Sequence, residues 1–392
     1  MGRVGRVLVV GGGVGGLTTA TALAQRGVEV TLVEKQADFS LPGVGLGQPA
    51  NALRVYRHLG VLDQVLDAGF VYRAMRYFDH DRNLVVEHPF LLGDATTPPV
   101  CALTRRRLHT ILYGAALRAG ASIRMATTVT DLEDTGGSVR VTLSDGTVET
   151  ADVVAGFDGI RSTTREAIFG GRFHPRPSGY GAWRIQEPRP AEVDAMEFLQ
   201  GIGSKTGAMP LDENLMYLFH IRREDPEVWF DQATLHVELR ERLAGYGSYV
   251  AAARDRLGPG SDIVYGPLEL LLIPGPWYSG RVVLGGDAAH VVPPHLTQGA
   301  AMAAEDGLVL ADELTRTDAD VEEMLRSYTF RRYARCAFVY TFARQMLDDE
   351  QAVHTPAHLA RHREDTAAHG SPRIGVSDLI LNEPVIKESV PA

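Results

Sequence analysis

The sequence of 392 residues predicts an α/β fold, in which a parallel-sheet domain assembled from distant parts of the chain carries an inserted antiparallel sheet. A glycine motif at 11–16 directly follows an apolar run, and a glycine–acid motif at 286–290 follows another. Between them, 175–276 consists of short β-like runs broken by Pro, Gly and Asp turns. The length exceeds that of a usual single core and also favours a composite architecture.

The first glycine motif has the context of a dinucleotide-binding turn. Residues 6–10 predict a β-strand, and 14–26 predict a helix with one apolar face. Gly11, Gly13 and Gly16 have the G-x-G-x-x-G spacing, which permits a tight turn, close approach of the backbone to a pyrophosphate and close helix–strand packing. The phosphates would lie at the helix N-terminus, where free N–H groups and the helix dipole favour negative charge. This part of the chain therefore predicts a Rossmann-like domain.

An acid and a distant second motif complete the cofactor prediction. Glu34 closes a strand predicted at 28–33, where its carboxylate can accept the hydrogen bonds of an adenosine ribose and would repel a 2′-phosphate. Gly286-Asp287-Ala288-Ala289-His290 follows a strand predicted at 281–284. One cofactor is then held by widely separated parts of a single fold, and we expect it to be FAD, bound tightly and without a covalent bond.

Composition and charge restrict the class of partner. The apolar fraction of 45% and the charged fraction of 22% are ordinary for a soluble globular protein. A net charge of −10 argues against a nucleic acid or an acidic membrane surface as partner, and no apolar run is long enough to span a bilayer. Cys101 and Cys336, the only cysteines, predict neither a disulfide framework nor a metal site of the usual spacing. Since the first strand leaves no room for a signal peptide, we expect a cytoplasmic protein, either a monomer or a homodimer.

A helix predicted at 105–118 supplies the candidate for a phosphate contact. It begins after Thr104 and opens with three arginines, against the usual preference for acids in a first turn. Arg105 lies at the helix mouth, where a guanidinium can bridge two phosphate oxygens. Arg106 and Arg107 are equally compatible with a solvated charged face.

We divide the chain into three parts. The expected FAD-binding domain comprises 1–70, 101–174 and 276–345, the expected substrate-binding sheet comprises 71–100 and 175–275, and a C-terminal helix and tail comprise 346–392. Within the sheet part, one helix is predicted at 238–257, and within the FAD part a strong helical pattern follows Gln298-Gly299 at 300–314.

Three motifs, in this order, resemble a known family. They are the glycine fingerprint, then Asp158-Gly159-Ile160-Arg161-Ser162 with Arg165, and then Gly286-Asp287-Ala288-Ala289-His290 with Pro294, Gln298, Gly299 and Asp306. Over about residues 7–314 the chain is similar to the group A flavoprotein monooxygenases, the single-component FAD-dependent hydroxylases related to p-hydroxybenzoate and salicylate hydroxylases. The resemblance implies a p-hydroxybenzoate hydroxylase-like fold. It also implies an enzyme that uses NADH or NADPH and O₂ to hydroxylate an aromatic, polyketide-like or other electron-rich small molecule through a flavin hydroperoxide.

The resemblance implies residue roles as well. Asp287 would bond the ribityl chain, the backbone of Gln298 to Ala301 would approach the flavin ring, and Asp158 would link the FAD region with the nicotinamide path. Arg105 matches a phosphate-contacting arginine, and Val129 matches an apolar residue near the adenine. The residues expected to bind FAD are Gly11, Gly13, Val14, Gly15, Gly16, Glu34, Lys35, Arg105, Val129, Asp158, Gly286, Asp287, Gln298, Gly299, Ala300 and Ala301.

Candidates for the reaction come from the sheet and from the loop after His290. Arg184 alternates with Trp183, so only one of them can face the cavity. Arg184, Pro294 and His295 are the catalytic candidates, since Pro294 would lie over the flavin and a histidine pKa suits proton transfer, although a lone histidine is often simply packed. The expected substrate contacts, for which sheet core is the alternative interpretation, are Tyr217, Phe219 and Met209. No catalytic triad or metal is expected.

The chain departs from the family pattern at Phe157, Thr297 and His295. Two other functions remain open. A flavin-dependent halogenase shares the fold, but its Trp-x-Trp-x-Ile-Pro signature is absent from the sequence. A non-catalytic binding protein of the GDI type keeps the glycine fingerprint but has no need of Gly286-Asp287.

Three histidines in the C-terminal part, His354, His358 and His362, are spaced by four and would share one helix face. No acid or cysteine completes a metal site there. We interpret them as a solvated face or a dimer contact.

Overall fold

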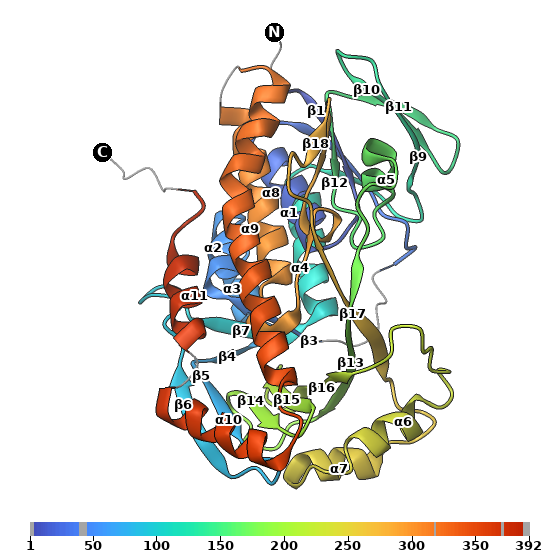
Figure 1. Ribbon diagram of the computed structural model, residues 1–392. Coiled ribbons are helices and arrows are strands. Elements are labelled where there is room, and N and C mark those ends of the chain that lie inside the picture. The colour runs from blue at the N-terminus through green and yellow to red at the C-terminus, as the bar shows by residue number, and fades with distance from the viewer. Residues whose placement is uncertain (1–3, 39–44, 317–318, 370–371, 387–392) are drawn as a thin grey trace.

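The computed structural model describes residues 4–38, 45–316, 319–369 and 372–386 (Figure 1). Its first part is built on a six-stranded sheet in which β1 lies at the centre, parallel to both neighbours. The order of the sheet is β18 (Tyr278–Ser279), β19 (Val282–Leu284), β12 (Val153–Gly156), β1 (Arg6–Val10), β2 (Glu29–Val33) and β8 (Ser122–Arg124). The central strands are apolar almost throughout, because helices and a small sheet cover both faces.

Helices cover this sheet and bring the distant motifs to one edge. α1 (Val14–Ala24) packs against α8 (Gly299–Arg316) and against α4 (Arg105–Arg118). The other helices of this part are α2 (Ala50–His58), α3 (Leu62–Asp67), α5 (Thr163–Phe169) and the long α9 (Val321–Gln351). A short helix η1 (Gly286–Ala288) directly follows β19, and a second, η2 (Pro294–Leu296), precedes α8. The carboxyl ends of β1 and β19 thus place both glycine motifs side by side.

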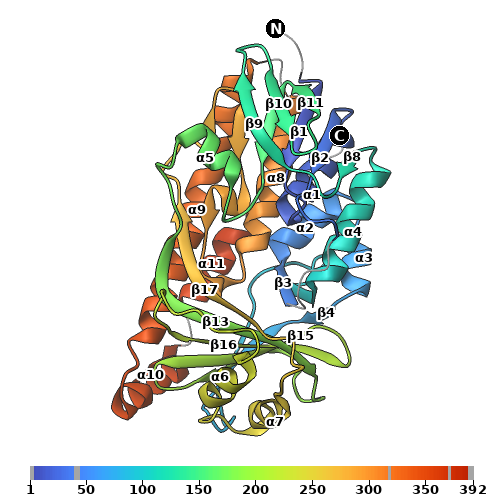
Figure 2. The same ribbon diagram turned by 90° about the vertical axis from the view of Figure 1, so that its right-hand side faces the viewer.

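Two small sheets flank the parallel sheet. One consists of β3 (Gly45–Pro49), β7 (Val100–Thr104) and β4 (Phe70–Tyr72), with β7 in the middle. The other is the meander β9 (Val129–Asp134), β10 (Val139–Leu143) and β11 (Val148–Ala151). β3 and β4 lie between the parallel sheet and the second part of the molecule (Figure 2).

The second part is an eight-stranded sheet. Its order is β20 (His290–Val291), β17 (Val264–Leu272), β13 (Arg176–Pro188), β16 (Leu215–Arg223), β15 (Ser204–Pro210), β14 (Met196–Gln200), β5 (Ala74–Phe78) and β6 (Leu84–Pro89). α6 (Leu235–Arg242) and α7 (Ser248–Arg256) cover one face with a separate apolar core. The opposite face carries a second apolar cluster and is directed toward the first part.

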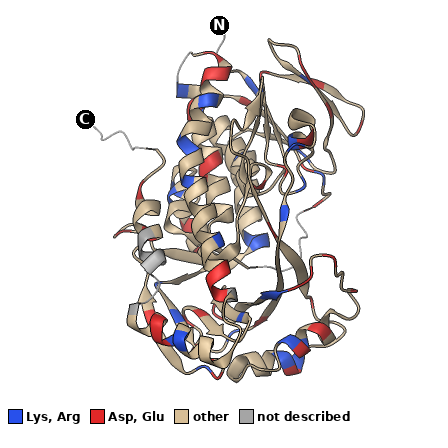
Figure 3. Cartoon of the chain, in the orientation of Figure 1, with Lys and Arg blue, Asp and Glu red and all other residues tan. Residues whose placement is uncertain are grey.

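The C-terminal helices connect the two parts. α9 runs along the molecule from the parallel sheet to the eight-stranded sheet (Figure 1). α10 (Pro356–His369) contacts β6, and α11 (Pro372–Asn382) contacts α2 and α9. Basic and acidic residues are mixed along α9, α10 and the α6–α7 pair, so these helices do not concentrate the net charge of −10 (Figure 3). None of the described helices has an apolar stretch long enough to cross a bilayer.

The α/β class with an added sheet is confirmed, and several details need correction. The helix predicted at 238–257 is in fact two helices, because the chain turns between α6 and α7 at a segment that contains Gly245 and Gly247. The sheet expected to be antiparallel contains one parallel pair, β14 with β5. His354 lies before α10 begins, so the three histidines do not share a helix face. The proposed division at 345/346 falls within α9, which therefore contributes to both parts.

Candidate functional site

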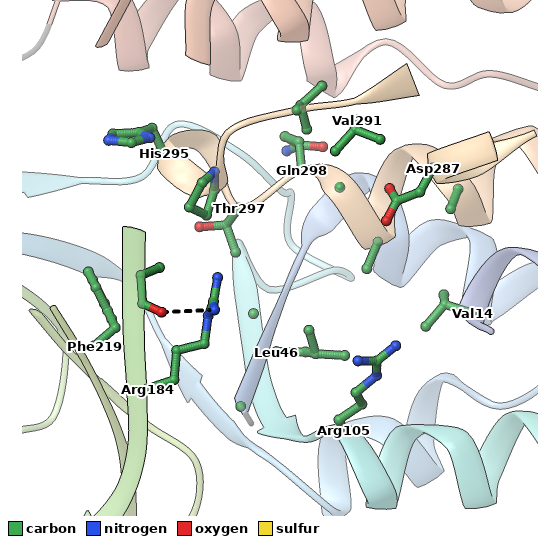
Figure 4. A pocket seen from close by; sticks show the side chains of 18 of the residues that line it. Val14, Leu46, Arg105, Arg184, Phe219, Asp287, Val291, His295, Thr297 and Gln298 are labelled. Atoms are coloured by element: carbon green, nitrogen blue, oxygen red, sulfur yellow. Dashed lines mark hydrogen bonds between the residues drawn. The ribbon is translucent and has the colours of Figure 1, made fainter. Parts of the chain in front are cut away.

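A cavity of about 400 Å³ lies where the two parts of the molecule meet. Figure 4 shows Arg105 and Asp287 on one side of it, Arg184 and Phe219 on the opposite side, and Gln298 and Thr297 between them. This size is ordinary for a small-molecule site. The predicted residues that line the cavity are Gly13, Val14, Gly15, Arg105, Arg184, Met209, Tyr217, Phe219, Gly286, Asp287, Pro294, His295, Gln298, Gly299 and Ala300.

The glycine turn is packed too tightly for side chains at three of its positions, one of which is Gly15, where a Cβ would lie 2.6 Å from the Phe157 ring. Gly11 has a φ of +104°, and a Cβ there would lie 2.4 Å from the Phe157 carbonyl oxygen. A Cβ on Gly16 would lie 1.9 Å from the carbonyl oxygen of Gly11. A Cβ on Gly13, by contrast, would meet nothing within 4 Å, since this residue borders the open cavity. Gly11 and Gly16 therefore shape the turn, whereas Gly13 leaves space for a ligand.

Arg105 brings a cation with an unsatisfied donor to the cavity. Its Nε is buried and has no hydrogen-bond partner within the described part of the chain. Burial lowers the pKa of Arg105, and the attraction of Asp287 and Glu34 offsets part of this effect. A buried guanidinium with an open donor is stabilised by a bound anion. This orphaned donor, beside the glycine turn at a helix N-terminus, fits the pyrophosphate of a dinucleotide such as FAD.

The neighbouring arginines of α4 behave differently. The side chains of Arg106 and Arg107 are exposed, and Arg107 donates to the Asp212 carboxylate at 2.9 Å. Thr104 caps the helix, because its Oγ1 accepts a hydrogen bond from the Arg107 N–H. Of the three arginines, only Arg105 lines the cavity.

Asp287 projects into the cavity from η1. The surrounding protein removes water from its inner side and raises the pKa of its carboxyl, an effect that His290 and Arg105 partly oppose. The turn behind it is held by Asp306, which is fully buried on α8. The Asp306 carboxylate accepts hydrogen bonds from the Gly286 N–H at 2.8 Å, from the His290 Nε2 at 2.6 Å and from the Arg332 Nε at 2.6 Å.

Three side chains of this buried network are of types that ligate metal ions. His290, Asp306 and Cys336 each offer an atom within 4.8 Å of the others, as a metal site requires. However, the Arg332 guanidinium already donates to Asp306, and together with His290 it lowers the pKa of that carboxyl to about 2 despite its burial. A cation in this place disfavours a metal ion, and we keep the prediction that the site holds none.

The start of α8 forms the third side of the cavity. Gln298, Gly299 and Ala300 line it, whereas Ala301 is fully buried and does not. The Gln298 side chain is fixed because its Oε1 accepts a hydrogen bond from the Asn51 Nδ2 at 3.0 Å, and Asn51 also donates to Glu305. The unpaired N–H groups of a helix N-terminus can stabilise negative charge on a ring placed there.

The eight-stranded sheet supplies the opposite wall. Trp183 is fully buried in the core under α6 and α7, so Arg184 is the member of the pair that faces the cavity. Arg184 donates a long hydrogen bond of 3.3 Å to the Ala182 carbonyl oxygen (Figure 4) and has no carboxylate partner among the residues that the structure describes. Burial raises the pKa of Tyr217, and the adjacent Arg184 opposes this rise. Phe219 and Met209 complete an apolar surface around this cation.

His295 lines the cavity as a member of a second charged cluster. Its ring is fully enclosed, and the Nε2 lies 3.0 Å from the Glu350 Oε2 without hydrogen-bond alignment. The Lys205 Nζ lies 2.6 Å from the same carboxylate. Burial and the charge of Lys205 lower the pKa of His295, and the Glu350 carboxylate opposes this shift. The sequence interpretation included neither Lys205 nor Glu350, which lie on β15 and α9, far from His295 in sequence.

Six of the predicted cofactor residues besides Ala301 do not line the cavity, namely Gly11, Gly16, Glu34, Lys35, Val129 and Asp158. Glu34 accepts a hydrogen bond of 2.6 Å from the Gly12 N–H, and Lys35 is exposed. Asp158 accepts hydrogen bonds from Ser162 and from the backbone and side chain of Thr164, so it fixes the start of α5. Their predicted roles toward FAD stay predictions.

Comparison with known proteins agrees with this geometry. A family model described as an FAD binding domain matches residues 5–180 and 274–343. The chain is 33% identical over 345 residues to the putative FAD-dependent monooxygenase YetM of Bacillus subtilis, covering 87% of this chain and 92% of the relative. It is 33% identical over 315 residues to the 2-heptyl-3-hydroxy-4(1H)-quinolone synthase of Pseudomonas aeruginosa, covering 78% and 79%.

A solved structure shows the same fold. The crystal structure of Klebsiella pneumoniae HpxO complexed with FAD and uric acid superposes with a TM-score of 0.84 over 96% of each chain, at 22% identity. The sequence motifs, the lining of the cavity and the family match agree. The chain belongs to the FAD-dependent monooxygenases of the group A aromatic hydroxylase family, which use NAD(P)H and O₂.

Proposed function

We propose that this enzyme hydroxylates a small aromatic or heteroaromatic ring whose acidic hydroxyl, oxo or ring N–H group is held by Arg184. The observation that carries the proposal is the position of this arginine. It faces the cavity from an apolar and aromatic wall, and it has no carboxylate partner within the described residues. A guanidinium in such surroundings stabilises an anionic ring oxygen or nitrogen, and an anionic ring is more electron-rich.

The remaining charges of the cavity support this assignment. Lys205 is neutralised by Glu350, and Arg105 lies on the side of the glycine turn. The quinolone synthase is named for a ring that carries oxygen substituents, which agrees with an acidic or polarised ring as substrate.

Residues of this chain would hold FAD and shield the reaction. The glycine turn and Arg105 would bind the pyrophosphate, Asp287 the ribityl chain, and the start of α8 the flavin ring. Bound FAD supplies the reductive activation of O₂ by NADH or NADPH, so that one oxygen atom enters the ring and the other leaves as water. Phe219, Met209 and Pro294 would exclude water from the ring, and Arg184 would hold its anionic group. No residue of the cavity wall is required as a nucleophile.

The test measures cofactor, binding and turnover separately. The purified protein should show flavin absorbance, and NADH or NADPH oxidation should rise when small phenols or hydroxylated heteroaromatics are added. Arg184→Met should raise the Kd of such a ring about ten-fold or more, the value of a lost charge-assisted hydrogen bond, while the FAD content stays unchanged. Arg222→Met is the matched control, because Arg222 follows the cavity-lining Ile221 and faces the other side of the sheet.

Other outcomes would favour the alternatives. A colourless protein would favour a non-catalytic binding function, and a chloride-dependent product would favour a halogenase. Equal ring affinity in Arg184→Met and wild type would refute the role of Arg184. A cytoplasmic location and a monomeric or homodimeric state remain further predictions.

A further inference from the structure

A second, smaller cavity of about 30 Å³ lies directly behind one wall of the main cavity. The two cavities share five lining residues, which are Met196, Phe198, His295, Thr297 and Gln298. The others come from β3, β4, β5, β7, the loop after β6, η2 and α11, and they are Pro49, Tyr72, Met75, Phe90, Leu92, Val100, Leu296, Ser377 and Asp378. We refer to this space as the rear chamber.

The wall of the rear chamber selects against charged groups. Most of its lining side chains are apolar or aromatic. The Asp378 carboxylate accepts a hydrogen bond of 2.8 Å from the Leu91 N–H, and burial raises the pKa of this acid to about 6. Among the residues that the structure describes, no Lys or Arg lines the chamber, and the nearby Lys205 is held by Glu350. An anion would meet the Asp378 carboxylate and none of the described cations, so the chamber suits an uncharged apolar group.

The partition between the two cavities is thin and adaptable. Met196 and Phe198 form it from the side of β14, and His295 and Thr297 form it from the side of η2. Methionine has three rotatable bonds and fits irregular or changing spaces, and Met75 lies on the far side of the same chamber. The present volume holds a group of about the size of a water molecule or a methyl group before any side chain moves.

We propose that the rear chamber is a subsite for an apolar substituent, such as an alkyl chain, on the ring that Arg184 holds. The chain enters between β14 and η2, while the ring stays in the main cavity. This inference rests on the proposed function, because it takes the ring position from Arg184. It defines the substrate class as an acidic aromatic ring with an apolar tail.

The first test uses the FAD-loaded full chain and 4-n-alkylphenols from methyl to octyl, with Kd measured from the perturbation of the flavin absorbance. We expect the Kd to fall about four-fold for each added methylene up to a limiting chain length. Val100→Phe fills the chamber and should shorten this limit, while the Kd of 4-methylphenol changes less than two-fold. Met75→Ala enlarges the chamber and should lengthen the limit. Leu92→Phe is a second filling variant if Val100→Phe does not fold.

Val100→Phe and Met75→Ala should shift the limiting chain length in opposite directions, which general damage to the fold would not do. An unchanged limit in both variants, or equal weakening of short and long phenols, would overturn the inference. A second measurement does not depend on the ring: xenon binds apolar cavities, so it should occupy the chamber in crystals of the wild type and be lost in Val100→Phe. Xenon in the chamber without binding of any phenol would refute the proposed function and keep the subsite. A chamber that takes up no xenon and produces no chain-length limit would refute the subsite alone.

Discussion

Neutralising Glu350 should cost the protein several kcal/mol of stability, because this carboxylate joins three elements inside the molecule. Glu350 on α9 is 9% exposed and lies 2.6 Å from the Nζ of Lys205, which is 3% exposed on β15, and 3.0 Å from His295 in η2. Burial opposes its ionisation, but Lys205 and His295 outweigh burial and lower the pKa of Glu350 from 4.5 to about 2. That difference corresponds to about 3 kcal/mol of stabilisation of the charged form.

Glu350→Gln leaves Lys205 as a buried cation without its partner. Breaking such a pair typically costs about 3–5 kcal/mol, which agrees with the value from the pKa. Lys205→Met should cost a similar amount, whereas the double variant should cost less than either single change, since no unpaired charge is left inside. Glu133→Gln is the control, because Glu133 forms an exposed pair with Arg140 and should change stability by only ~0–1 kcal/mol.

The assay is urea unfolding at a fixed excess of FAD, followed by tryptophan fluorescence. The free energy of unfolding is obtained for wild type, both single variants and the double variant. The argument would be refuted if the loss in free energy of unfolding of the double variant equalled the sum of the losses of the two single variants. So would a loss below 1 kcal/mol in Glu350→Gln.

The lowered pKa of Glu350 also predicts how the free energy of unfolding depends on pH. The folded-state pKa of Glu350 is lowered, so its contribution is fully present above about pH 4.5 and is lost as the pH falls toward 2. Glu350→Gln should therefore lose stability less steeply than wild type in this range. Equal slopes for the two proteins would contradict the assigned ionisation.

Three further outcomes are expected. Arg105→Met should raise the Kd for FAD about ten-fold to a hundred-fold in fluorescence titrations of the apoprotein, while Arg106→Met, changed at an exposed position of the same helix turn, should leave it within two-fold. Gly16→Ala should lower the melting temperature, because its Cβ would lie 1.9 Å from a carbonyl oxygen. Gly13→Ala should keep the fold and weaken FAD binding. Equal melting temperatures of the two variants would contradict this expectation. Asp306→Asn should cost about 3–5 kcal/mol in urea unfolding, because it removes the carboxylate that three buried donors share, and a loss below 1 kcal/mol would show that the network does not hold the Asp287 turn.

The sequence was sufficient where a short segment carries its own signal. β1 and α4 have the predicted bounds, because an apolar run, a capping threonine and a glycine turn are local features. The glycine turn and η1 meet at one cavity as expected, since both follow strands of the same parallel sheet. The alternation of Trp183 and Arg184 predicted that only one faces the cavity but not which one. That choice depends on α6 and α7, which cover the other face.

Pairs that are distant in sequence could not be predicted in this way. Lys205 and Glu350 are 145 positions apart, and nothing in the local pattern of either residue indicates a buried partner. Charged residues are usually exposed, so both would be assigned to the surface. Arg332, which supports the Asp287 turn through Asp306, is hidden for the same reason. The parallel pairing of β5 with β14 likewise depends on how two separate segments meet.

One helix accounts for the fixed distance between the cofactor side and the substrate side of the cavity. In its first half, α9 is bound to α8 through Arg332 with Asp306 and through Arg335 with Glu305. The last turn of α9 lies beside the eight-stranded sheet (Figure 1), and there Glu350 binds Lys205 of β15 and contacts His295. Arg332 and Glu350 are 18 positions apart, which corresponds to about 27 Å along the helix. Both ends are charged and buried, so each is costly to break, and together they hold the Arg184 wall at a set distance from the turn that carries Asp287. A change at either end should therefore alter affinity for the ring as well as stability, although neither end needs to touch the ring.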